Sequence, residues 1–188
     1  MNTNSSFKGH FLIAMPNLLD PNFVKSVTFI CEHNQDGAFG LVINNETDAT
    51  VGEVFAQLDI ESRPDNPYIE QKVFVGGPVD TERGLILHRP VGNWASTICQ
   101  NDDLGVTSSL DILRDIADDK APEDFMICLG YAGWGAGQLE EEIAANAWLN
   151  GPADYDIIFK TPVLDRWQAA AGLLGVDLSL LSSDVGHA

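Results

Sequence analysis

The sequence is poor in positive charge. It holds 10 Lys and Arg against 28 Asp and Glu, which gives a formal net charge of −18 at pH 7. The first 100 residues contain 12 acids and 6 bases, and the remainder contains 16 acids and 4 bases. Binding to nucleic-acid backbones or anionic membranes depends on clustered Lys and Arg, and here the bases are scattered. We therefore expect no direct nucleic-acid binding and no association with a membrane surface.

Cysteines and long apolar runs are also scarce. The cysteines Cys31, Cys99 and Cys128 are odd in number and widely spaced, which disfavours a disulfide framework and suits a reducing compartment. No apolar run approaches the roughly 20 residues of a membrane span. The first ten residues, MNTNSSFKGH, lack the basic and apolar regions of a signal peptide. We expect a cytoplasmic protein.

Common catalytic and metal-binding motifs are missing as well. The sequence contains no G-x-S-x-G, no H-E-x-x-H and no C-x-x-C. Cys31 and His33 lie two residues apart in a predicted strand and therefore on one face, as in half of a metal site or a Cys–His nucleophile pair. That face also carries the apolar Val27 and Phe29, which is typical of a buried structural cysteine.

The other histidines give no firmer metal signal. His10 and His88 each lie at the end of a predicted strand, and His187 lies in the C-terminal tail. A metal site built from His10, His33 and His88 remains an alternative, although no spacing between them requires it. We predict no bound metal and no cofactor.

The sequence does contain enough apolar residues, 45%, for a packed core. Paired strands come early, and strands alternate with helices in the last third, which predicts an α+β fold with a mixed sheet. We expect one folding unit over residues 1–188, with room for two lobes, and a frayed tail over 182–188. The predicted strands are 10–15, 26–33, 39–43, 72–75, 84–88, 94–99, 104–107, 125–129 and 155–159. The predicted helices are 51–58, about 109–118, 138–150, and a last helix from 162 to about 174.

Local signals support several of these elements. Asp36-Gly37 is typical of a hairpin turn. Thr50-Val51-Gly52-Glu53 matches a capping box at a helix start. We also expect Ser108 or Ser109 to cap the helix that follows, with Leu110 on its buried face, and Thr161 to cap the last helix.

The most unusual stretch is residues 125–148, FMICLGYAGWGAGQLEEEIAANAW. We interpret it as a buried strand, a glycine-rich turn and an amphipathic helix. The turn fails the dinucleotide fingerprint at Gln138 and the P-loop pattern at Ala136, and three glutamates on the first helical turn oppose an anion. One interpretation is that the glycines allow tight packing around Tyr131 and Trp134. The other is a binding site for a neutral or cationic group.

Two further loops add to the second interpretation. Asn44-Asn45 and Gly76-Gly77-Pro78 both follow strands, and they serve either as ordinary turns or as loops that present backbone donors to a ligand. Binding residues tend to lie in such loops. The candidate binding residues are Tyr131, Trp134, Gln138, Glu142, Gly76, Gly77, Pro78 and Asn44.

Several blocks along the chain resemble the YqgE/AlgH family of bacterial proteins. No block of the family pattern is missing, and Ser62 to Gln71 is the least typical segment. The blocks occur in the family's order and cover most of the chain. They are GHFLIAMPNLLDPNF from Gly9, SVTFICEHNQDGAFGLVIN from Ser26, VGGPVDTERGLILH from Val75, LGYAGWGAGQLEEEIAANAWL from Leu129, and P-x-x-x-R-W from Pro162.

The resemblance implies an α+β fold with a bifurcated sheet that includes a small barrel-like part surrounded by helices. It implies no established activity and no catalytic residues. Some family members carry a transcriptional-regulator label, which fits an indirect role better than DNA binding at this net charge. Our leading hypothesis is a non-enzymatic protein that binds a protein partner or small ligand. The alternative is a small-pocket hydrolase or redox enzyme using Cys31, His33 or His88.

Overall fold

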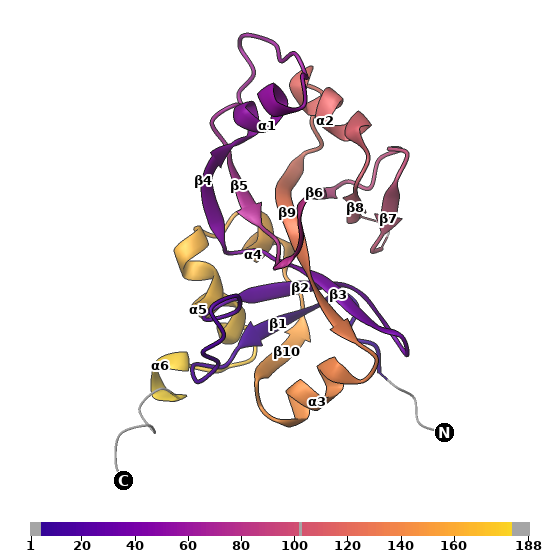
Figure 1. The fold of residues 1–188 in the computed structure, drawn as a ribbon. Helices are drawn as coiled ribbons and strands as arrows, with labels where there is room; N and C mark the ends of the chain where they lie inside the picture. Colours follow the sequence, from indigo (N-terminus) through magenta and orange to yellow (C-terminus); the bar gives the residue numbers. More distant parts are fainter. Residues whose placement is uncertain (1–4, 102, 182–188) are drawn as a thin grey trace.

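The structure is a computed structural model that describes residues 5–101 and 103–181. Its strands form a curled sheet with helices around it (Figure 1). The main strand order is β10-β1-β2-β3-β9-β6-β8-β7, and β5 pairs with both β4 and β9. The β5–β9 pair is parallel and its neighbours are antiparallel, so the mixed, half-barrel α+β fold is confirmed.

The elements have the following bounds. The strands are β1 His10–Ala14, β2 Val27–Asn34, β3 Gly37–Val42, β4 Glu46–Thr50, β5 Lys72–Val75, β6 Val79–Arg89, β7 Thr97–Cys99, β8 Gly105–Thr107, β9 Asp124–Gly135 and β10 Trp148–Pro152. The helices are α1 Val51–Gln57, α2 Leu110–Ala117, α3 Gln138–Ala144, α4 Tyr155–Phe159, the 3-10 helix η1 Val163–Asp165, α5 Arg166–Gly172 and α6 Leu178–Leu181.

Strand β9 is where the sheet divides. Its first half pairs with β5 and β6, and its second half pairs with β3 from Gly40↔Ala132 to Gly37↔Gly135. In Figure 1 the orange β9 runs from the upper part, which holds β4 to β8 with α1 and α2, into the lower part with β1 to β3, β10 and α3. The sheet is therefore bifurcated because the single long strand β9 pairs with two different sets of neighbouring strands.

The predicted glycine-rich turn after Leu129 is wrong, because Gly130 to Gly135 continue β9. Gly130 lies where another stretch of backbone, at Gly77, passes close by. A Cβ on Gly77 would lie 2.1 Å from the carbonyl carbon of Tyr131, and one on Gly130, which has φ +73°, would lie 2.6 Å from the Gly77 oxygen. Only glycine fits such an approach. The actual turn is confined to Ala136 and Gly137.

Three predictions about the last third of the chain also need correction. Residues 155–159 form α4 rather than a strand, because Asp154 Oδ1 accepts hydrogen bonds from the amides of Asp156 at 2.8 Å and Ile157 at 3.4 Å. Helix α3 ends at Ala144 instead of 150, and Trp148 begins β10. Thr161 does not cap the last helix, since η1 intervenes before α5.

Helix α2 begins at Leu110 as expected, but Leu110 is 44% exposed, and Ile112, Leu113, Ile116 and Ala117 make the buried face. Ser109 occupies the cap position without a capping hydrogen bond from its side chain. The capping box of α1 is confirmed: Thr50 Oγ1 accepts from the Glu53 amide, and Glu53 Oε2 accepts from the Thr50 amide. The predicted tail over 182–188 lies outside the described residues, as does His187.

Three apolar clusters hold the sheet and helices together. The largest joins both parts of the sheet with α4, α5 and α6 and contains Phe11, Phe29 and Leu87. A second packs α1 and α2 on the upper strands, and a third lies under α3 and contains Trp134 and Trp148. Among the described residues, no helix combines the length and the apolar character needed to cross a membrane.

Candidate functional site

The aromatic residues of the predicted binding face lie on opposite sides of β9. Successive side chains of a strand alternate between faces, so Tyr131 and Trp134, three residues apart, point in opposite directions. Trp134 is buried in the cluster under α3. Tyr131 is half-buried on the other side, with its ring edge-to-face against Phe39 at a centroid distance of 6.0 Å. The structure does not bring these two residues into one site.

On the Trp134 side, Glu142 joins three donors. Its Oε2 accepts hydrogen bonds from the indole N–H groups of Trp134 and Trp148, both at 2.9 Å. Its Oε1 accepts from Gln138 Nε2 at 3.0 Å, and Gln138 Oε1 accepts from the Gly135 amide at 3.0 Å. This network ties β9, α3 and β10 together and occupies the polar groups of three predicted binding residues.

The predicted loop residues also have internal partners. Asn44 bridges two strands: its Oδ1 accepts from the Val27 amide and its Nδ2 donates to the Lys25 carbonyl, both at 2.9 Å. The Gly76 amide donates to Leu129 O at 2.9 Å, and its carbonyl accepts from Val42. Pro78 is exposed beside them. The backbone amide and carbonyl of Gly76 are thus both used within the sheet, and Pro78 has no N–H to donate.

Cys31 and His33 do not share a face, contrary to the sequence-based expectation. The register of β2 and β3 shifts between Ile30 and Glu32, which leaves Cys31 as an extra residue. Such a bulge inverts the alternation beyond it. Cys31 therefore enters the main core, while His33 accepts from the Phe7 amide at Nδ1 (2.9 Å) and lies 2.7 Å from Glu140 at Nε2.

His88 is fully buried in a separate hydrogen-bonded chain. Its Nδ1 lies 3.0 Å from Pro90 O and its Nε2 lies 2.7 Å from Thr107 Oγ1, which in turn lies 2.7 Å from Thr97 Oγ1. Burial lowers the pKa of His88 from its ordinary value, and the bond to Pro90 opposes this in part. His88 thus joins β6 to β8 and β7, far along the chain from the His33 contacts.

The two described buried cysteines are poor nucleophiles. Burial raises the pKa of Cys31 well above its ordinary value and raises that of Cys128 to about 12. A thiol, unlike a thiolate, reacts slowly. Among the described residues, no three His, Cys, Asp or Glu side chains are arranged to hold a metal ion. The structure therefore offers no support for a catalytic group built from Cys31, His33 and His88.

A cavity of about 280 Å³ lies beside Tyr131, which is one of its lining residues. Its apolar lining is partly core, since Leu85 and Val106 are buried, and partly exposed, since Ile98 is 42% exposed. Its polar groups come from four different strands or their ends. The lining residues are Phe39, Arg83, Leu85, Ser96, Ile98, Val106, Ser108 and Tyr131.

Four polar side chains of this cavity have no partner within the part of the chain that the structure describes. Among the described residues, neither the Arg83 guanidinium nor the hydroxyls of Tyr131, Ser96 and Ser108 have a hydrogen bond or ion pair. Among the described residues, the lining contains no Asp, Glu, His or Cys. These lining residues thus include groups that orient a ligand but no general base and no thiol.

Sequence reasoning found only Tyr131 of this cavity. Arg83 was missed because the predicted strand began at Gly84, whereas β6 begins at Val79. The residues that line the cavity come from β3, β6, β7, β8 and β9 or from the ends of these strands. No short stretch of sequence contains them together. Extending the alternation of residues 84–88 backwards would have placed Arg83 on the face of Leu85.

Comparisons with known proteins agree with this fold. A protein-family model described as AlgH-like matches residues 11–179. A UPF0301 protein of Thioalkalivibrio sulfidiphilus is 56% identical over 188 residues, and one of Nitrosococcus oceani is 50% identical over 188 residues, with 100% of each chain covered in both cases.

Solved structures give the same result. The solution structure of the AlgH protein from Pseudomonas aeruginosa has a TM-score of 0.80 and 45% identity, and covers 100% of this chain and 99% of that one. A crystal structure of a Corynebacterium diphtheriae protein has a TM-score of 0.75 at 22% identity, over 97% and 94% of the two chains, and supports the fold alone. With matches of this extent in sequence and in fold, the chain belongs to the AlgH-like family.

Proposed function

We propose that this protein is a non-enzymatic binding protein of the cytoplasm that holds a small amphipathic anion in the cavity beside Tyr131 and acts indirectly in regulation. The observation that carries the proposal is the combination of an apolar cavity with an arginine that has no acidic partner among the described residues. In a chain of net charge −18, acids are abundant. An arginine left unpaired beside an apolar cavity is suited to a ligand's negative group.

The shape and lining favour a ligand with a flat apolar body. Tyr131 and Phe39 form an edge-to-face pair on one side, with Ile98 and Val106 also in the lining. Aromatic and branched side chains bind apolar surface without directional demands, and the free hydroxyls of Ser96 and Ser108 add hydrogen bonds that fix orientation. Because the described lining residues include no general base and no thiol, binding is better supported than catalysis.

The test uses a matched pair of fluorescent probes. 8-Anilinonaphthalene-1-sulfonate has an aromatic body and one sulfonate, and N-phenyl-1-naphthylamine has the same body without the charge. We expect the sulfonate to bind, and Arg83→Gln to weaken it about tenfold, the order expected for one charged hydrogen bond. The neutral probe should bind the wild type and Arg83→Gln equally.

The control is Arg114→Gln. Arg114 is an exposed arginine on α2 that lies outside the cavity, so this change lowers the net charge equally and should leave sulfonate binding unchanged. Equal weakening by both substitutions would mean that only overall charge matters. Undiminished sulfonate binding by Arg83→Gln would overturn the proposal.

A further inference from the structure

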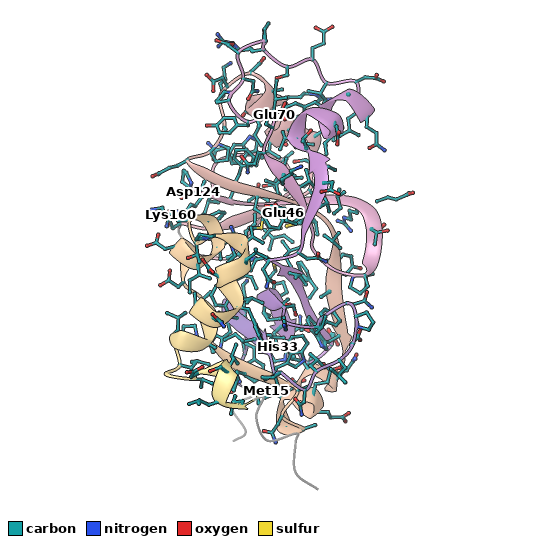
Figure 2. The ribbon with its side chains drawn as sticks, turned by 90° about the vertical axis from the view of Figure 1, so that its left-hand side faces the viewer. Met15, His33, Glu46, Glu70, Asp124 and Lys160 are labelled. Carbon is teal, nitrogen blue, oxygen red and sulfur yellow. The ribbon has the colours of Figure 1, made fainter. Side chains whose placement is uncertain are left out.

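A second cavity, of about 330 Å³, lies on another side of the molecule, where the upper strands meet the C-terminal helices. Figure 2 shows Glu46, Asp124 and Lys160 at this level of the molecule. Its lining combines apolar and aromatic residues with charged ones. The former include Phe74, Phe125, and Ile158 and Phe159 of α4, and the latter are Glu46, Lys72, Glu123, Asp124 and Arg166. None of the residues considered in the sequence-based binding surface lines this cavity.

The cavity contains a buried cation, Arg166, which is 6% exposed. Its Nε donates to Thr161 O at 2.9 Å and its Nη1 donates to Ile43 O at 2.5 Å. Its guanidinium carbon lies 5.4 Å from the centre of the Phe74 ring. Within the described part of the chain, Arg166 has no ion pair, and its Nη2 has no hydrogen bond.

A buried guanidinium without a carboxylate partner is unusual, because removing its charge from water costs free energy that an anion normally offsets. Arginine has five N–H donors, and two bond carbonyls here. The unused donors match the two oxygens of a carboxylate, which arginine binds in a bidentate manner.

The opposite charge is also present in the cavity lining. Glu46 and Glu123 are exposed, and neither has an ion pair among the described residues, whereas Asp124 pairs with Arg89 at 2.7 Å. Glu46 acts electrostatically on Arg166 without touching it. A plain anion approaching Arg166 would meet these acids, but a ligand that also has an ammonium group would be attracted both by the arginine and by the glutamates.

We infer that this second cavity binds a free apolar amino acid, with its carboxylate on Arg166, its ammonium toward Glu46 and Glu123, and its side chain against the aromatic wall. Tyr68 and Phe125 form part of that wall, edge-to-face at 5.1 Å. A cavity of this size is at the lower end of the range for small ligands. Peptide termini fit less well, because each presents only one of the two charges at its end.

Three compounds with one phenylethyl skeleton test the charges separately: L-phenylalanine, 3-phenylpropanoate without the ammonium, and 2-phenylethylamine without the carboxylate. Each is added, up to about 20 mM to reach millimolar affinities, to the full ¹⁵N-labelled chain. We expect L-phenylalanine to shift the amide signals of Lys72, Glu123 and Phe159, and to bind about tenfold more tightly than 3-phenylpropanoate. The amine should produce no saturable shift.

Two substitutions sharpen the assignment. Glu123→Gln should weaken L-phenylalanine several-fold and leave 3-phenylpropanoate unweakened, because it removes an attraction for the ammonium only. Arg166→Lys should weaken both carboxylates about tenfold, since lysine lacks the planar fork. If Arg166→Lys does not fold, the Glu123 result alone decides, since Glu123 is exposed.

Arg83→Gln, in the other cavity, is the control and should change nothing here. Equal binding of the three compounds, shifts confined to residues around Tyr131, or no binding of L-phenylalanine would overturn the inference. The inference would also be overturned if Glu123→Gln left the ratio of the affinities for L-phenylalanine and 3-phenylpropanoate unchanged. Shifts around Tyr131 alone would support the first cavity as an anion site while overturning this one, and the other outcomes leave the sulfonate experiment untouched, so the two sites stand or fall separately.

Discussion

The two faces of the second half of β9 differ in how their polar groups are used. On the Trp134 face, both indole N–H groups, the Gln138 amide and the Glu142 carboxylate bond to one another. On the Tyr131 face, the tyrosine hydroxyl and the Arg83 guanidinium have no such partner among the described residues, and a cavity lies between them and the apolar wall.

This difference indicates that one face of β9 stabilises the fold and that the other face is available for binding. Polar groups that satisfy one another stabilise the fold and have little left for a ligand. Polar groups that stay unpaired beside an apolar surface contribute little to folding and remain available. The Trp134 face should therefore respond to mutation through the free energy of unfolding, and the Tyr131 face through binding.

The strongest effect is expected for Glu142→Ala. The substitution leaves the indole N–H groups of the buried Trp134 and Trp148 without their acceptor, and each unsatisfied buried donor costs about 1–3 kcal/mol. We expect a loss of about 3 kcal/mol in the free energy of unfolding, measured by urea denaturation. Glu141→Ala, at an exposed position of the same helix, is the control. Equal midpoints for the two variants would show that the Trp134 face is not held by this carboxylate.

The next largest effect is expected for Gly77→Ala, because the backbone of Gly77 packs directly against the backbone of β9 at Tyr131. The new Cβ would lie 2.1 Å from the Tyr131 backbone, so the strands must separate, and overpacking of this kind costs about 1–3 kcal/mol. Gly172→Ala on α5, where a Cβ meets nothing within 4 Å, should be neutral or stabilising. If Gly77→Ala is as stable as Gly172→Ala, the approach is looser than the structure indicates.

Local signals in the sequence were sufficient where a whole structural unit lies within a few residues. The capping box at Thr50 and Glu53 and the Asp36-Gly37 hairpin were both confirmed, because their partners are close in the chain. The Asp154 cap lies within the sequence as well, but it was not considered, and the apolar residues of 155–159 were interpreted as a strand.

The rest depended on partners distant in the chain. The segment from Gly130 onward was interpreted as a turn because the loop that crowds Gly130, at Gly77, is about 50 residues away. The bulge at Cys31, which turns His33 to the other face, has no sequence signature of its own. Arg83 and Ile98 meet only through the pairing of β6, β8 and β7, so the cavity could not be derived from local patterns.

A smaller, pH-dependent effect is expected from His88, which ties together the strands that form one wall on the Tyr131 side. Burial lowers its pKa, so the folded state binds its proton less readily than the unfolded state does. Its contribution to stability is therefore complete above about pH 6.5 and is lost as the pH falls below that value, by at most about 1.4 kcal/mol per pH unit.

The measurement compares the free energy of unfolding of the wild type and His88→Gln between pH 7.5 and pH 5.5. The wild type should lose more stability than the variant over this range, because the other titrating groups are common to both. An NMR titration of the His88 ring should give a midpoint below 6.5. A midpoint above 6.5, or parallel pH profiles, would contradict the expectation that burial of His88 favours its neutral form.

The smallest effects on stability are expected for Arg83→Gln and Tyr131→Phe, and these test the comparison most directly. Neither polar group has a partner among the described residues, so each substitution should change the free energy of unfolding by less than about 0.5 kcal/mol. Both should nevertheless weaken binding of the sulfonate probe, and Arg83→Gln more so because it removes the charge. A loss of stability similar to that of Glu142→Ala would mean that the Tyr131 face is also built to hold the fold. Unchanged stability together with weakened binding would mean that the Trp134 face of β9 stabilises the fold and the Tyr131 face binds the ligand. Only polar groups that the fold does not use remain available to a ligand.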